Sequence, residues 1–87
     1  MLKLPAVLTH AEATACLADW LSQLPLGDGP VAVDGQALER FDSAALAVLL
    51  ELRRHLHGQR RGLALEAAPA RLQDLAALYG VDELLAI

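Results

Sequence analysis

The sequence predicts an α/β domain with a small, mostly parallel β-sheet of about 3–4 strands and about 3–4 helices. Short runs rich in Val, Leu and Ala alternate along the chain with longer segments whose apolar residues recur at helical spacing. This alternation is typical of βαβ units, whose right-handed crossovers keep neighbouring strands parallel. The 87 residues, 55% of them hydrophobic, suffice for one core and not for two. We therefore expect a single domain over residues 1–87.

The first apolar stretch, residues 2–8, is interrupted by Pro5. Because proline has no N–H to donate to a sheet, this stretch predicts an edge strand or an irregular lead-in. Thr9 and Glu12 then have the spacing of a capping box, in which the Thr9 hydroxyl accepts a hydrogen bond from the Glu12 amide. The helix that they open is expected to run to about Leu24, with Leu17, Leu21 and Leu24 on its apolar face and Trp20 at the flank.

The centre of the chain predicts a buried strand, an irregular segment and then a helix. Residues 31–33 are a brief apolar run of strand type. Asp42 and Ser43 are both good N-cap residues and stand directly before an apolar-rich stretch. The helix is expected to continue to about His57, with Gly58 as the residue that stops it. Five of its residues share one stripe and should face the sheet: Ala45, Val48, Leu49, Leu52 and Leu56.

The last third of the chain predicts another strand and another helix. Residues 63–67 read as the strand, and Pro69 is placed for the first turn of the helix. Gly80 should end this helix, and residues 81–87 supply one further short apolar segment. The apolar stripe of the helix is expected to comprise Leu72, Leu75, Ala76 and Tyr79.

The central helix is apolar nearly all round in its first two turns, which is unusual for a helix on the outside of a sheet. Roughly opposite the sheet-facing stripe lies a second stripe, made of Ser43, Leu46, Ala47, Leu50 and Arg54. Two explanations stand. Either neighbouring helices cover Leu46 and Leu50, or this face is a docking surface on which the small Ala44 and Ala47 let a partner approach closely.

Composition and charge argue against several classes of function. The net charge of −4 argues against nucleic acid as the main partner, because neutralising phosphates needs an excess of Lys and Arg. No apolar run approaches the ~20 residues needed to cross a bilayer, and the N-terminus lacks the features of a signal peptide. Cys16 is the only cysteine, which excludes an internal disulfide and fits a reducing compartment. We expect a cytoplasmic chain without direct membrane insertion.

Nor do the titratable residues form a constellation that indicates catalysis or metal binding. Asp34 and Asp42 are not accompanied by a nucleophile, a histidine or a glycine-rich phosphate loop, so turn and cap roles explain them better than acid–base chemistry. His55 and His57 point about 200° apart on a helix, which makes shared metal ligation a poor interpretation. We therefore expect no enzymatic activity, no cofactor and no metal.

Four arginines, Arg53, Arg54, Arg60 and Arg61, surround the end of the central helix. We expect them to be solvated and to complement the helix dipole. The alternative is that they contact anionic lipid headgroups.

Residues 34–50 resemble the central motif of STAS domains. In that family an aspartate ends a strand, and Asp-Ser or Asp-Thr opens the next helix, with a small residue two positions on. Here Asp34 precedes Asp42 by eight residues, and Ala45 stands where anti-sigma-factor antagonists usually have glycine. Residues 63–66 and 71–81 are similar to the family's later strand and helix. The resemblance spans about Val31 to Leu85, and the family's N-terminal hairpin is shortened here.

Within the family, the Leu-Ala-Xaa-Leu-Leu pattern of the motif is most similar to the MlaB-like members. The resemblance implies a non-catalytic subunit that binds the cytoplasmic ATPase (MlaF-like) of an MlaFEDB-like phospholipid ABC transporter, and through it the permease. Such a subunit supports assembly and activity, and the transporter maintains outer-membrane lipid asymmetry. It would be cytoplasmic and peripheral to the inner membrane. The implied partner-binding residues are Asp42, Ser43, Ala44, Leu46, Ala47, Leu50 and Arg54.

The same motif supports a function of another class. By resemblance to anti-sigma-factor antagonists, Ser43 is a candidate phosphorylation site, and the partner would be an anti-sigma-factor kinase. A helix N-terminus tolerates a phosphate, whereas a charge of about −2 on an apolar docking face would expel a partner. For the MlaB-like members the hydroxyl is expected instead to cap the helix and contact the partner.

Overall fold

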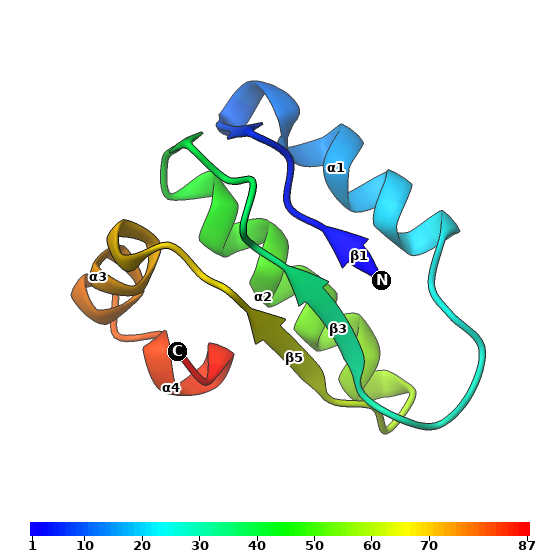
Figure 1. The fold of residues 1–87 in the computed structure, drawn as a ribbon. Helices are drawn as coiled ribbons and strands as arrows, with labels where there is room; N and C mark the ends of the chain where they lie inside the picture. The colour runs from blue at the N-terminus through cyan, green and yellow to red at the C-terminus, as the bar shows by residue number, and fades with distance from the viewer.

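Three parallel strands form the main sheet of the computed structural model, which describes all of residues 1–87. They are β1 (Leu2–Lys3), β3 (Val31–Asp34) and β5 (Leu63–Glu66), in the order β1-β3-β5 (Figure 1). Two shorter strands, β2 (Val7–Leu8) and β4 (Arg40–Phe41), pair in parallel with each other. The helices are α1 (His10–Ser22), α2 (Ala44–Gly58), α3 (Ala70–Leu78) and α4 (Asp82–Leu85). The predicted α/β class with a mostly parallel sheet is confirmed.

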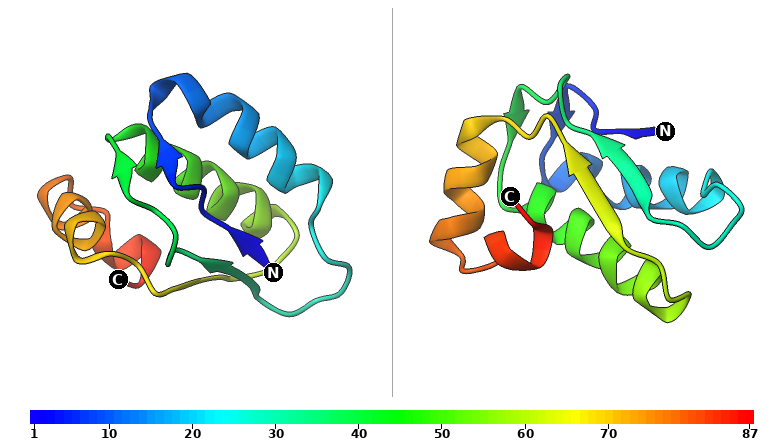
Figure 2. Two further views of the ribbon diagram at one scale, coloured as in Figure 1. Left: turned by 45° about the horizontal axis from the view of Figure 1, so that its top comes forward. Right: turned by 60° about the horizontal axis from the view of Figure 1, so that its bottom comes forward.

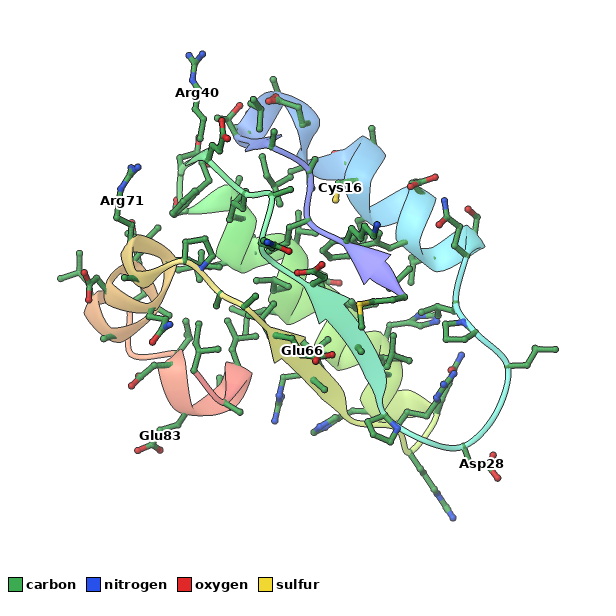
Figure 3. The ribbon with its side chains drawn as sticks, in the orientation of Figure 1. Cys16, Asp28, Arg40, Glu66, Arg71 and Glu83 are labelled. Carbon is green, nitrogen blue, oxygen red and sulfur yellow. The ribbon has the colours of Figure 1, made fainter.

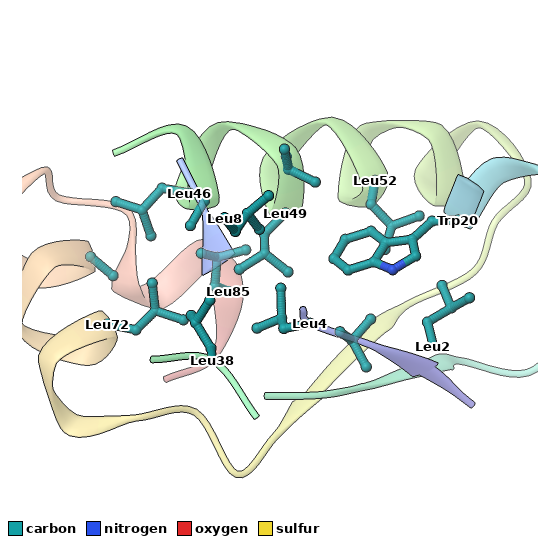
Figure 4. Close-up of a cluster of buried hydrophobic side chains, with 14 of the residues drawn as sticks. Leu2, Leu4, Leu8, Trp20, Leu38, Leu46, Leu49, Leu52, Leu72 and Leu85 are labelled. Carbon is teal, nitrogen blue, oxygen red and sulfur yellow. The ribbon is translucent and has the colours of Figure 1, made fainter. Parts of the chain in front are cut away.

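The domain has two layers, with α1 and α2 side by side on one face of the sheet and α3 and α4 at one end of it (Figure 2). The central helix is α2, which contacts α1, α4 and β5. Its predicted sheet-facing stripe is confirmed, because all five side chains are at most 3% exposed. They belong to a single cluster of 16 buried hydrophobic residues between the layers, part of which is shown in Figure 4.

The other face of the sheet carries no helix, and the strands alternate accordingly between core and solvent. In β3, Val31 and Val33 are buried beneath the helices, whereas Asp34 is only half-buried. The parallel register places Lys3, Asp34 and Glu66 next to one another across the three strands. The outer face of the sheet is therefore charged, unlike the face that packs on α2.

The lead-in of residues 2–8 combines the two structures expected for it. In the main sheet β1 takes an edge position, and Pro5 lies between β1 and β2. The segment before α2, expected to be irregular, contains β4, which gains its pairing from β2. A strand of two residues has no periodicity of its own, so no pattern in the sequence predicts it.

The buried face of α1 differs from the predicted one. Trp20, expected at the flank, is only 2% exposed, and its Nε1 donates to the Lys3 carbonyl oxygen at 3.2 Å. Leu21, expected on the apolar face, is 37% exposed. The helix ends at Ser22, two residues before the predicted Leu24. The indole ring explains the difference, since it can bury a large apolar surface while its N–H finds an acceptor on β1.

Thr9 and Glu12 interact, but they do not form the predicted capping box. The Thr9 hydroxyl donates to the Glu12 carboxylate at 2.9 and 3.0 Å, and the Thr9 side chain makes no capping bond to a backbone amide. The Glu12 amide bonds to the Thr9 carbonyl oxygen instead, at 3.0 Å. The Thr9 hydroxyl is therefore a donor to the carboxylate here and not the acceptor of a backbone amide.

The left-handed residue that stops α2 lies two positions beyond the predicted Gly58. Gly58 is the last helical residue, and Arg60 adopts the left-handed backbone with φ 58°. The amide of Arg61 donates to the Leu56 carbonyl oxygen at 2.9 Å, and that of Arg60 to the His57 carbonyl oxygen at 3.0 Å. These two bonds make a Schellman motif with an arginine where glycine is usual.

Arg61 is buried, which corrects the expectation that it is solvated or meets lipid. It is 7% exposed, and its Nε and Nη1 donate to the carbonyl oxygens of Gly29 at 2.8 Å and Pro25 at 2.6 Å. These bonds tie the loop between α1 and β3 to the end of α2. Arg54 and Arg60, in contrast, are exposed as expected.

Replacing Arg60 with glycine should stabilise the domain by about 0.5–1 kcal/mol. The left-handed backbone costs other residues about 1–2 kcal/mol, and the greater freedom of glycine in the unfolded chain offsets part of the gain. Urea denaturation measures the difference. Arg60→Ala is the matched control, because it removes the same side chain but retains the Cβ. An equal gain from Arg60→Ala would contradict this explanation.

Candidate functional site

A shallow apolar groove of about 230 Å³ runs along the outer side of the first half of α2. One wall comes from α2, and the other comes from the turn between α3 and α4. Its lining is hydrophobic except for the hydroxyls of a serine and a tyrosine: Ser43, Leu46, Ala47, Leu50, Tyr79 and Val81. The groove therefore brings together four of the seven residues that the sequence analysis assigned to partner binding.

The two explanations offered for the apolar stripe each describe part of it. Leu46 is 3% exposed and belongs to the core, where Figure 4 shows it in the same region as Leu85 of α4. Ser43 and Ala47 are exposed, and Leu50 is half-buried. Neighbouring elements thus cover the inner edge of the stripe, while its outer edge stays open as the floor of the groove.

The other three assigned residues lie outside the groove. Asp42 is exposed and directly precedes Ser43, and Ala44 is half-buried on another side of the first turn. Arg54 lies one turn beyond Leu50 and lines a second cavity, between α1 and α2. Four of the seven assigned residues therefore line the groove, and the charged Asp42 and Arg54 lie near its two ends.

Tyr79 is a groove residue that the sequence analysis placed in the buried stripe of α3. It is 59% exposed, while Leu72 and Ala76 of the same stripe are fully buried. The helix stops before it: Gly80 has φ 72°, and the amide of Val81 donates to the Ala76 carbonyl oxygen at 2.9 Å. The predicted stop at Gly80 is thus confirmed, and it is what turns Tyr79 out of the core. The Gly80 signal could have suggested this.

The Asp42 carboxylate accepts hydrogen bonds from the first backbone amides of both α2 and α1. One carboxylate oxygen, Oδ1, accepts from the Ala44 amide at 2.8 Å, and Oδ2 accepts from the His10 amide at 3.2 Å. The same side chain therefore caps α2 and joins it to the start of α1. Ser43 makes no capping bond, which corrects its expected role as a cap. Its exposed hydroxyl remains available at the end of the groove.

Both aspartates of the motif have the turn and cap roles expected of them. The Asp34 carboxylate accepts from the Gln36 amide at 2.9 Å, which stabilises the turn after β3. Backbone amides thus occupy oxygens of both carboxylates. No group of three or more His, Cys, Asp or Glu side chains is placed to hold a metal ion. The chemistry that the groove offers is apolar contact together with two hydroxyls, on Ser43 and Tyr79, that can form hydrogen bonds.

Cys16 lies apart from the groove, packed half-buried against the core. Burial, and to a lesser extent the nearby Asp19 carboxylate, raises the pKa of its thiol from 9.0 to about 11. Both effects disfavour the thiolate. This packing agrees with the simple interpretation of the cysteine as a small core residue.

Comparison with known families gave one match. The family model described as "Mlab, STAS domain" matches residues 1–86. Comparisons with curated proteins and with solved structures gave no match. The matched range includes the whole of the sheet, α2 and both walls of the groove.

Asp42→Ala should destabilise the domain by about 1–2 kcal/mol, because the amides of two helix starts lose their acceptor. Ser43→Ala should change stability by less than about 0.5 kcal/mol, since that hydroxyl caps nothing. Urea denaturation of the two variants tests the assignment. A larger loss for Ser43→Ala than for Asp42→Ala would reverse the two roles.

The Cys16 thiol should react slowly with iodoacetamide while the domain is folded. Because its pKa is raised from 9.0 to about 11, the folded protein at pH 8 holds about 100-fold less thiolate than the unfolded chain. Alkylation rates in buffer and in concentrated urea measure this ratio, with a rise in the folded rate as pH approaches 11. Equal rates in both conditions would refute the shift.

Proposed function

The chain belongs to the MlaB-type STAS domain family, whose model it matches over residues 1–86, and we propose that it is an accessory subunit of a phospholipid ABC transporter. Its role in this proposal is to bind the cytoplasmic ATPase of an MlaFEDB-like assembly and to support assembly and activity. It contacts the permease only through that ATPase. It catalyses no reaction itself and needs no cofactor.

The apolar groove on the outer side of α2 is the observation that carries this proposal. A helix that covers a sheet normally presents polar residues to solvent. Here the solvent side of the first half of α2 presents Ala47 and Leu50, with Val81 opposite them. Apolar surface that is gathered into one groove and bordered by polar residues is typical of a protein–protein contact.

The residues around the groove suit a contact with another protein. Tyr79 offers an aromatic ring of the kind that dominates binding energy at interfaces, and Leu78 beside it is 79% exposed. Ala47 lets a partner backbone approach closely, and the Ser43 hydroxyl supplies a hydrogen bond. The proposed contact set remains Asp42, Ser43, Ala44, Leu46, Ala47, Leu50 and Arg54, to which we add Leu78, Tyr79 and Val81.

This proposal places the protein at the cytoplasmic side of the inner membrane through its partner. No helix in the structure is both long and apolar enough to span a membrane. A subunit held by an ATPase needs no span of its own. The transporter as a whole would serve the lipid asymmetry of the outer membrane.

A second candidate function, antagonism of an anti-sigma factor, rests on the state of Ser43. Its side chain is exposed at the start of α2 and caps nothing, so a kinase could reach it without breaking a structural bond. A phosphate there would be stabilised by the helix N-terminus and would put charge onto the groove. Phosphorylation would then control release of a kinase-type partner.

Leu50→Asp should weaken binding to the transporter ATPase at least about 30-fold, because it puts a charge on the groove floor. The ATPase is co-expressed with its permease from the same organism, and the two are purified as a complex. The affinity is measured by titrating each variant of the domain into this complex. Leu26→Asp is the matched control. It makes the same substitution at a fully exposed leucine in the loop after α1, outside the groove.

Circular dichroism and thermal melting establish that both variants are folded. Equal affinity of folded Leu50→Asp and wild type would exclude the groove as the contact. Binding of an anti-sigma-factor kinase in place of the ATPase, lost in Ser43→Asp and retained in Ser43→Ala, would favour the second function.

A further inference from the structure

We propose that the docking surface continues along α2 into a second cavity, which receives a carboxylate side chain of the same partner. This inference rests on the proposed function and assigns a chemistry to the partner. The cavity has a volume of about 420 Å³ and lies between α1 and the second half of α2. Its lining is Leu17, Leu21, Glu51, Arg54, His55, Gly58 and Gln59.

The two cavities follow one another along the same helix. Leu50 lines the first, Glu51 lines the second, and Arg54 lies one helical turn beyond Leu50 on the same side. The residues of α2 and its two ends that line the cavities run from Ser43 to Gln59, a rise of about 24 Å at about 1.5 Å per residue. A single helical segment of a partner, roughly four turns long, is enough to contact both cavities along their whole length.

The second cavity differs from the first in chemistry. Its apolar wall comes from α1, where Leu17 is half-buried and Leu21 is 37% exposed. Its polar side comes from the end of α2, where the Gln59 amide and the His55 ring lie 3.4 Å apart. An amphipathic side chain with an acidic end, such as glutamate, fits a hollow whose apolar wall faces the donors of Arg54 and Gln59, with the Glu51 carboxylate beside them.

The charge of this end of the molecule favours an acidic occupant. Residues 53–61 contain four of the seven Lys and Arg residues and no carboxylate, in a chain of net charge −4. Of these four, Arg61 is committed to two carbonyl oxygens of a loop. Arg54 makes only one weak ion pair. Its Nε lies 3.7 Å from Glu51 Oε1, and the two side chains are 78% and 56% exposed. Its guanidinium can therefore take a partner carboxylate.

An anionic membrane surface is the competing occupant for these arginines. A bilayer needs several cations on one exposed face, whereas Arg61 is buried and Arg53 is half-buried. Glu51 also lines the same cavity as Arg54, and would be repelled by a dense anionic surface. A single carboxylate needs only the exposed guanidinium of Arg54. Glu51 in the same cavity opposes this contact, and the Glu51→Gln variant measures by how much.

Affinity for the transporter ATPase, measured at low and high salt, tests the inference. Arg54→Glu should weaken binding about tenfold at about 50 mM salt, and only about threefold at about 500 mM, because salt screens the exposed charge. Glu51→Gln should strengthen binding about twofold, because it frees Arg54 from its neighbour. Arg40→Glu is the matched control, since Arg40 is exposed, lines neither cavity and points away from the domain at the other end of α2 (Figure 3).

The outcomes separate the two proposals. If Leu50→Asp abolishes binding while Arg54→Glu binds as Arg40→Glu does at both salt concentrations, the carboxylate site is refuted and the proposed function stands. If the wild type does not bind the ATPase, both fail. If Arg54→Glu leaves ATPase affinity unchanged but abolishes sedimentation with phosphatidylglycerol vesicles, the occupant is a lipid surface and the inference is overturned.

Discussion

The packing of α2 against the three-stranded sheet is the interaction on which the rest of the structure depends. One stripe of this helix, from Ala45 to Leu56, fills the space above β3 and β5 with aliphatic side chains. The remaining elements are arranged around that contact: α1 lies beside α2, and α4 covers its other flank. Because α2 is fixed from three sides, its fourth side is presented to solvent as a rigid surface.

The start of α2 is held rigidly, yet it leaves the Ser43 hydroxyl free to bind a partner. Asp42 takes over the capping that a serine often performs, and it also joins the beginnings of α1 and α2. This leaves the Ser43 hydroxyl without a structural task at the end of an apolar groove. A residue in that position can change its partner, or be modified, without loss of the helix start. The separation of the two roles is what makes the site suitable for docking or for a switch.

The loops of this small domain are fixed by a buried arginine and by left-handed residues that are not glycine. Arg61 uses a buried guanidinium to fix the loop before β3, and Arg60, Ala67 and Ala86 adopt left-handed backbone without being glycine. Each such residue costs free energy that a small aliphatic core must offset. A partner that binds only the folded state would add stability in proportion to its affinity and concentration. A small accessory subunit fits such an arrangement.

The sequence by itself determined the fold class, the order of the main strands and helices, and the buried stripe of α2, because each rests on local periodicity and on punctuation by residues such as Gly80. The aspartates at positions 34 and 42 were likewise readable as turn and cap residues. Only the tertiary structure decided that Trp20 replaces Leu21 in the core and that Arg61 is buried. These depend on which surfaces of distant segments meet, and no spacing within one helix encodes that.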